Sequence, residues 1–167
     1  GPGFLSAQAL EDPAHDEPAT GVLHVTGSGL VQVQPDRARL SFAVETEAED
    51  ARGAAARNAE LMEAVLAALR EAAGEGLTLE TSGYNVVPVY EQRRPDGPRT
   101  PQIAGYRVVN QVSAVTDDLE GVGDLVDAGL GAGSNRISGL SFFVSDYRDA
   151  QDEAYALAVA DALRQAR

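Results

Sequence analysis

The sequence predicts an α+β domain, in which helices cover one face of a mostly antiparallel five-stranded sheet in the order ββαββαβα. Two observations support this prediction. Residues 23–33 and 38–46 alternate between apolar and polar side chains, which is the period of a strand with one buried face. Three later segments repeat apolar residues at helical spacing, and glycines follow two of them.

The first two strands are expected to form a hairpin. The turn between them, at residues 34–37, contains Pro35, which presets the backbone angle that a turn needs, and Asp36, which can bond to the backbone that follows it. Both strands would then show one face to a core and one face to water. The apolar side chains expected to face the core from the second strand are Leu40, Phe42 and Val44.

The remaining elements are predicted from the same two patterns, the alternation of a strand and the three-to-four-residue spacing of a helix. Pro88 predicts that the end of its strand lies at a sheet edge or a bulge, because proline has no N–H for the ladder. The expected elements are a helix at 50–73, a strand at 77–90, a strand from Tyr106, a helix from Asp117 or Asp118, a strand at 137–145 and a helix from near Asp146.

Composition limits the classes of function. The 167 residues, of which 44% are hydrophobic and 23% charged, are typical of one globular domain. The absence of cysteine excludes disulfides, thiolate nucleophiles and sulfur-ligated metals. A net charge of −13 repels phosphate-rich partners, so we expect no nucleic-acid binding. No apolar run approaches the length of a membrane-spanning helix, so no such segment is expected.

Residues 1–20 are predicted to be a disordered tether, because acids and prolines crowd a segment with few large apolar groups. Within it, Ala7-Gln8-Ala9 has the small-x-small form of a signal-peptidase site. The tether is therefore interpreted as a signal-peptide remnant or an expression scar. The folded domain is expected to occupy residues 21–167.

No catalytic, metal or cofactor site is predicted. His15 and His24 lie apart from any second ligand in the sequence, and the acidic clusters suit helix N-termini better than a calcium loop. A hydrolase triad is not expected because the serines that enter strands have no histidine base near them. These serines are Ser41, Ser82 and Ser138.

One loop, at residues 91–107, is basic on an otherwise acidic chain, and it combines arginines with aromatic side chains. Such a mixture suits the binding of carboxylates or of a partner surface. The alternative is a solvated hairpin tip. The candidate binding or oligomer-contact residues are Tyr90, Arg93, Arg94, Arg99, Tyr106 and Arg107.

Five blocks, in this order and at this spacing, resemble the SIMPL-domain family over residues 22–166. They are Pro35-Asp36-Arg37-Ala38-Arg39-Leu40-Ser41-Phe42, Thr81-Ser82-Gly83-Tyr84, Pro88-Val89-Tyr90, Gly105-Tyr106-Arg107-Val108-Val109-Asn110 and Asn135-Arg136-Ile137-Ser138-Gly139-Leu140-Ser141-Phe142.

The resemblance implies an exported bacterial protein, periplasmic or otherwise in the envelope, with members linked to oxidative-stress defence and one that assembles into a channel-like oligomer. It offers no agreed catalytic residues. Family members usually continue past the last helix into further strands, so the domain is expected to be truncated at its C-terminus. We therefore expect a non-enzymatic protein that contacts itself or another envelope protein. The alternative is a monomeric module that binds a small anionic ligand through the loop at 91–107.

Overall fold

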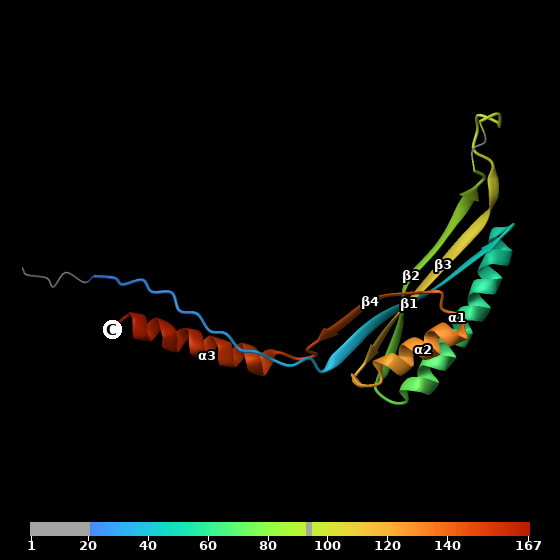
Figure 1. Ribbon diagram of the computed structural model, residues 1–167. Helices are drawn as coiled ribbons and strands as arrows, with labels where there is room; N and C mark the ends of the chain where they lie inside the picture. Colours follow the sequence, from blue (N-terminus) through green and yellow to red (C-terminus); the bar gives the residue numbers. More distant parts are fainter. Residues whose placement is uncertain (1–20, 93–94) are drawn as a thin grey trace, which may run out of the picture. The chain divides into compact units, whose positions relative to one another are not determined.

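The structure is a computed structural model that describes residues 21–92 and 95–167, so the tether predicted for residues 1–20 lies outside the described residues. The described residues form two compact units: a larger one, Val31–Gln151, and a smaller one in which Asp152–Arg167 associates with residues 21–30. The elements, labelled in Figure 1, are β1 (Arg37–Ala48), α1 (Ala51–Ala73), β2 (Leu77–Tyr90), β3 (Ile103–Thr116), α2 (Val122–Ala132), β4 (Arg136–Phe143) and α3 (Arg148–Gln165).

The larger unit contains one antiparallel sheet of four strands in the order β2-β3-β1-β4. The prediction of five strands is wrong, although the α+β class is right. Strand β1 lies in the middle and pairs with β3 from Ala38 opposite Thr116 to Ala48 opposite Tyr106. Strand β2 is at one edge, as Pro88 predicted, and β4 is at the other.

The missing strand is the first one predicted. Residues 23–33 alternate like a strand but form none, and the hairpin with residues 38–46 is absent. The reason is that both sides of β1 are already occupied, one by β3 and the other by β4. Asp36, expected in a tight turn, instead donates its backbone N–H to the carbonyl oxygen of Phe143 at 3.1 Å.

The pairing of β1 with β4 is interrupted by a register shift between Arg39 and Ser41. On β4, Gly139 lies in this stretch with φ 67°, a left-handed conformation that side chains disfavour and glycine tolerates. The Ser138-Gly139 pair in the sequence therefore marks a bulge, and it lets β4 follow β1 on both sides of the shift.

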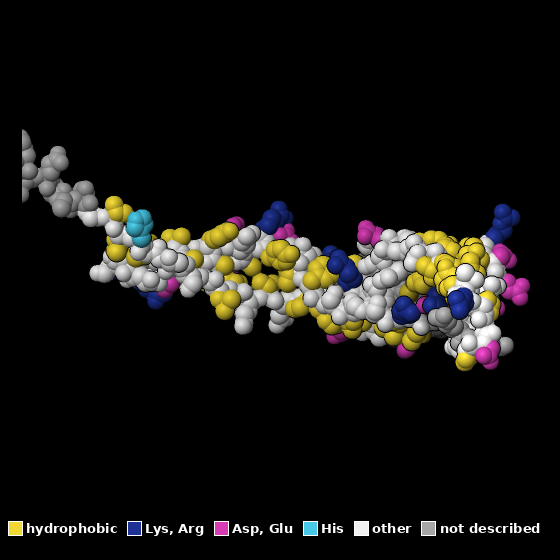
Figure 2. Space-filling model, turned by 90° about the horizontal axis from the view of Figure 1, so that it is seen from above, with side chains coloured by type: hydrophobic (Ala, Val, Ile, Leu, Met, Phe, Trp, Pro, Cys, Tyr) yellow, Lys and Arg dark blue, Asp and Glu magenta, His cyan; other side chains and the backbone are white. Residues whose placement is uncertain are grey.

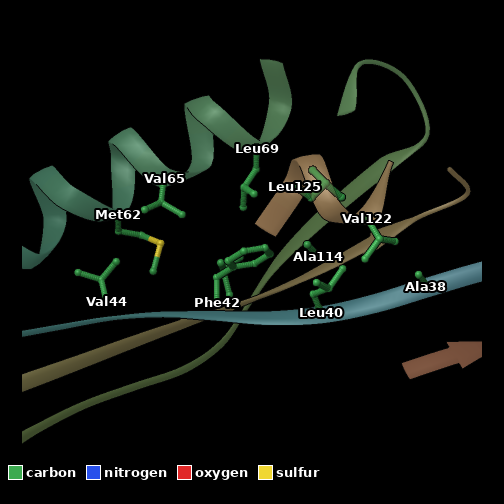
Figure 3. Packing of buried hydrophobic residues seen from close by; sticks show 11 residues of the cluster. Ala38, Leu40, Phe42, Val44, Met62, Val65, Leu69, Ala114, Val122 and Leu125 are labelled. Atoms are coloured by element: carbon green, nitrogen blue, oxygen red, sulfur yellow. The ribbon is translucent and has the colours of Figure 1, made fainter. Parts of the chain in front are cut away.

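The core lies between one face of the sheet and helices α1 and α2 (Figure 1). Figure 3 shows the side chains of β1 pointing toward the two helices. Leu40, Phe42 and Val44 are fully buried, which confirms their predicted orientation. The helices contribute the facing apolar side chains, namely Met62, Val65, Leu69, Val122 and Leu125.

Helix α1 begins where the sequence predicted. The carboxylate of Asp50 accepts a hydrogen bond from the N–H of Gly53 at 2.7 Å, and Gly74 ends the helix with φ 62°. One buried position of α1 is polar: Asn58 is fully buried and donates to the carbonyl oxygens of Val44 and Val108. This side chain therefore fixes the helix against two neighbouring strands.

A second polar link closes the end of the sheet where β1 begins and β4 ends. The carboxylate of Asp36 accepts hydrogen bonds from the backbone N–H of Ser145 at 2.7 Å and from its hydroxyl at 2.5 Å. These bonds lower the pKa of Asp36 below its usual value of 3.8. The link holds the chain at Ser145 beside the start of β1.

In the smaller unit, residues 21–30 run beside α3 (Figure 1). Gly27 and Gly29 lie against the helix backbone so closely that a Cβ atom on Gly27 would be 1.9 Å from the carbonyl oxygen of Ala158. The N–H of Ser28, between the two glycines, donates to the carboxylate of Asp161 at 3.0 Å. The Gly-Ser-Gly sequence is thus a packing motif for a helix.

Replacing Gly129 with alanine is expected to destabilise the larger unit by about 1–3 kcal/mol, because a Cβ atom there would be 2.4 Å from Cε1 of Phe42. The matched control is Gly131→Ala in the same helix, where nothing lies within 4 Å. That change should be neutral or stabilising by up to about 1 kcal/mol. Urea unfolding of both variants checks the prediction, and equal stabilities would contradict it.

The Asp36 link predicts a pH dependence. Because folding lowers this pKa, its stabilisation is fully present well above pH 3.8 and is lost as pH falls through the lowered value. Asp36→Asn should therefore reduce the free energy of unfolding near neutral pH and reduce the loss of stability on acidification. Urea unfolding between pH 6 and pH 2.5 measures both. If the free energy of unfolding of the variant depends on pH as that of the wild type does, the hydrogen bonds between Asp36 and Ser145 do not stabilise the protein in this way.

Gly27→Ala should detach residues 21–30 from α3, since the new methyl group would overlap the carbonyl of Ala158, at a cost of about 1–3 kcal/mol. Gly21→Ala is the control, because nothing lies within 4 Å of that position. Hydrogen exchange at the Ser28 amide should become faster in the Gly27 variant only. Unchanged protection in that variant would show that the segment does not pack in this way.

Candidate functional site

The loop residues predicted as a contact site are only partly described. Tyr90 is the last residue of β2 and is 53% exposed, and Arg99 is exposed in the loop that joins β2 to β3. Arg93 and Arg94 lie outside the described residues. The expectation that this loop contacts a partner therefore stays a prediction.

The other two predicted residues are neighbours on β3, and neighbouring residues of a strand point to opposite faces of the sheet. Tyr106 pairs with Ala48, and Arg107 pairs with Glu47. Tyr106 therefore points to the face of the sheet that carries the buried Thr46 and Val108 and that the helices cover. Arg107 points to the opposite face, which the helices leave open. The structure does not bring these two side chains onto one surface.

Arg107 forms ion pairs on the open side of the sheet. Its guanidinium is 3.1 Å from the carboxylate of Glu45 and 2.6 Å from that of Glu47. The hydrogen bond to Glu47 raises the pKa of Arg107 above its usual value. Glu45 also accepts a bond from Arg136 on β4 at 2.9 Å, so these charges connect three strands and belong to the sheet.

Residues 21–92 and 95–167 contain no group of three or more His, Cys, Asp and Glu side chains placed to hold a metal ion. His24 is exposed in the smaller unit. None of the helices in the described part of the chain is both long enough and apolar enough to cross a membrane.

The surface that sequence reasoning missed is on α3. This helix has no buried residue. Its half-buried positions, which include Ala154, Ala158 and Asp161, turn toward residues 21–30, as the contacts of Gly27, Ser28 and Gly29 show. We call the opposite side the outer face of α3, and it consists of Ala156, Val159, Ala160 and Leu163, all exposed.

Large apolar side chains are exposed on both parts of the smaller unit. Val159 and Leu163 are 60% and 59% exposed on the helix, and Leu23 is 67% exposed on the extended segment. Figure 2 shows hydrophobic side chains exposed along the part of the chain that carries His24, coloured cyan. The helical spacing of residues 156, 159, 160 and 163 was the available sequence signal.

Asp161 lies on the side of α3 that faces residues 21–30, and it accepts several hydrogen bonds there. Its carboxylate accepts bonds from Ser28, Arg164 and Gln165, and the bond from the Ser28 N–H is the main reason why the pKa of Asp161 is lowered. The charged side chains on this inner side are therefore committed to the unit itself. The outer face of α3 is exposed among the residues that the structure describes.

Similar proteins have been found by sequence. The chain is 32% identical over 166 residues to the 26 kDa periplasmic immunogenic protein of Brucella melitensis, covering 98% of this chain and 65% of that protein. It is 27% identical over 161 residues to the uncharacterized protein YggE of Edwardsiella ictaluri, covering 96% and 64%. The chain thus spans less than two thirds of the length of these relatives.

Among solved structures, the crystal structure of AtUAH in complex with glyoxylate is similar over 71% of this chain and 27% of that one, with 10% identity and a TM-score of 0.35. A likeness this low supports no argument about fold or activity. The sequence model of SIMPL, described as a protein of unknown function (DUF541), matches residues 23–167. The chain therefore belongs to the SIMPL family.

Proposed function

We propose that this chain acts in the bacterial envelope by protein contact, as a self-assembling protein or as a partner of another envelope protein, and not by catalysis. The observation that carries the proposal is α3, a helix of 18 residues without one buried residue. In proteins most of the stability of a helix comes from packing against other elements. Among the described residues, the extended segment at 21–30 covers one side of this helix.

Covering this surface would be favourable. Fully burying a side chain such as valine or leucine contributes about 1.5–3 kcal/mol relative to leaving it exposed. Val159 and Leu163 retain more than half of their exposure, and they lie four residues apart on one side of the helix. A partner that covers both gains from each, which supports a contact surface at α3.

The location in the envelope rests on the relatives, because the Brucella protein at 32% identity is named periplasmic. A link to oxidative-stress defence is part of the same proposal, and it rests on the family resemblance. The anion-binding alternative is less well supported, because the guanidinium of Arg107 is already paired with Glu45 and Glu47.

The test is the solution mass of the chain by light scattering and sedimentation. We expect a mass above the 17.5 kDa of a single chain that grows with protein concentration. If apolar surfaces hold the assembly, its mass should persist as salt rises, whereas a contact made by exposed charges should weaken. A mass of one chain at every concentration and salt would reject self-assembly.

The same experiment separates the two candidate contacts. Replacing Arg93, Arg94 and Arg99 together with glutamate should dissociate the assembly if the basic loop holds it. If α3 holds it, the triple variant should keep the wild-type mass.

A further inference from the structure

We propose that Asp96 and Gly97 are a site of spontaneous covalent modification, at which aspartate converts to isoaspartate through a cyclic succinimide. The inference goes beyond the proposed function and does not depend on it, since the reaction needs only the chain itself. Three observations support it: the chemistry of the pair, its place at the tip of the β2–β3 hairpin, and the lack of a hydrogen bond that holds either reacting group.

The pair brings an electrophile and a nucleophile into one short stretch of chain. The side-chain carboxyl carbon of Asp96 and the backbone nitrogen of Gly97 are the two atoms that close a five-membered ring. Glycine has no Cβ atom to obstruct this approach, and its backbone reaches conformations that other residues disfavour. In the whole sequence this is the one place where an aspartate or an asparagine precedes a glycine.

The fold leaves the pair in the open. Both residues are exposed in the loop that joins β2 to β3, next to the turn at Pro95. The base of this loop is closed by the N–H of Glu91, which donates to the carbonyl oxygen of Gln102 at 2.9 Å. Figure 1 shows the loop beyond the ends of α1 and α2, so neither helix packs on it.

Neither reacting group is restrained. Among the residues that the structure describes, no hydrogen bond engages the carboxylate of Asp96 or the N–H of Gly97. Rotation about the bonds of Asp96 can therefore bring its carboxyl carbon to the amide nitrogen, and the reaction gains the advantage of an intramolecular step.

Other aspartates of the chain lack this freedom. The carboxylates of Asp36 and Asp161 each accept hydrogen bonds from a backbone N–H elsewhere in the chain. Asp124 lies in α2, where the N–H of the next residue, Leu125, donates to the carbonyl oxygen of Gly121 at 3.1 Å. A nitrogen committed to a helical hydrogen bond cannot turn toward the preceding side chain. The structure therefore singles out Asp96.

The reaction balances without an oxidant, a reductant or a cofactor. The nitrogen of Gly97 forms a bond to the carboxyl carbon of Asp96, and the carboxyl hydroxyl leaves as water together with the amide proton. Water then adds to either carbonyl carbon of the ring. Cleavage of the new bond restores aspartate, whereas cleavage of the original peptide bond gives isoaspartate, in which the main chain runs through the Asp96 side chain.

The product differs from the original chain in its path and not in its charge. Isoaspartate retains one carboxylate and the same mass, but it adds a methylene group to the main chain and carries its carboxylate at a new position. The change lies beyond the bond between Glu91 and Gln102, so the sheet keeps its pairing. What it alters is the path of the loop toward Arg99, which is exposed three residues further on.

The test is to incubate the purified chain at neutral pH for increasing times. Protein isoaspartyl methyltransferase then transfers a labelled methyl group from S-adenosylmethionine to any isoaspartyl carboxylate. We expect the label to rise with time and to lie in the tryptic peptide that ends at Arg99. An aged wild type without label in this peptide would overturn the proposal.

Two variants test the assignment to this pair. Asp96→Glu should lose the label in this peptide, because ring closure would then require a less favourable six-membered ring. Gly97→Ala should slow the labelling severalfold, since the methyl group obstructs the nitrogen. Gly97 has no positive φ among the described glycines, so alanine at this position causes no backbone strain. Labelling of Asp96→Glu at the wild-type rate would show that another residue reacts.

Two further measurements test the structural part of the argument. A synthetic peptide of residues 91–102 gives the rate for an unrestrained chain, and the folded protein should react within severalfold of it. A far slower folded protein would show that the loop holds the pair. Urea unfolding of the aged and fresh proteins should give the same free energy, because the site lies outside the core. A loss of stability on ageing would contradict this placement.

Discussion

The packing of β1 beneath α1 and α2 is the constraint on which the rest of the larger unit depends. Strand β1 lies between β3 and β4 in the sheet. Its buried side chains must therefore pack beside two neighbouring strands and beneath two helices at once. Phe42 shows how tight this arrangement is, since it leaves room for no side chain at position 129 of α2. Close packing of this kind fixes which residues can approach and which strands can be adjacent.

The sequence was sufficient for the class of fold, for the buried side of β1 and for the start of α1, because each is decided by local periodicity or by a cap. It failed at residues 23–33, where the same alternation did not produce a strand. An alternation of apolar and polar side chains indicates that a segment is able to form a strand. Whether it pairs with β1 depends on which strands already occupy the two sides of β1, and these are β3 and β4. Asn58 shows the same limit, because a polar residue at a buried helix position is explained only by the carbonyls above it.

The candidate contact surfaces were harder to predict than the fold. The basic loop was visible in the sequence as a run of arginines, but strand geometry separates Tyr106 from Arg107, and Arg107 is paired within the sheet. The exposed outer face of α3 was hidden for a different reason. Its alanines fit a buried helix equally well, and only the position of Gly27 and Gly29 shows which side of α3 is covered.

The edge position of β2 has a consequence for crowded surroundings. An edge strand of 14 residues, paired with β3 on one side alone in the described sheet, is a template on which other chains can add backbone hydrogen bonds and aggregate. Pro88 removes one donor from this template, and Glu80 places an exposed negative charge on it. These two residues would disfavour edge-to-edge pairing between the sheets of different molecules, even at high protein concentration.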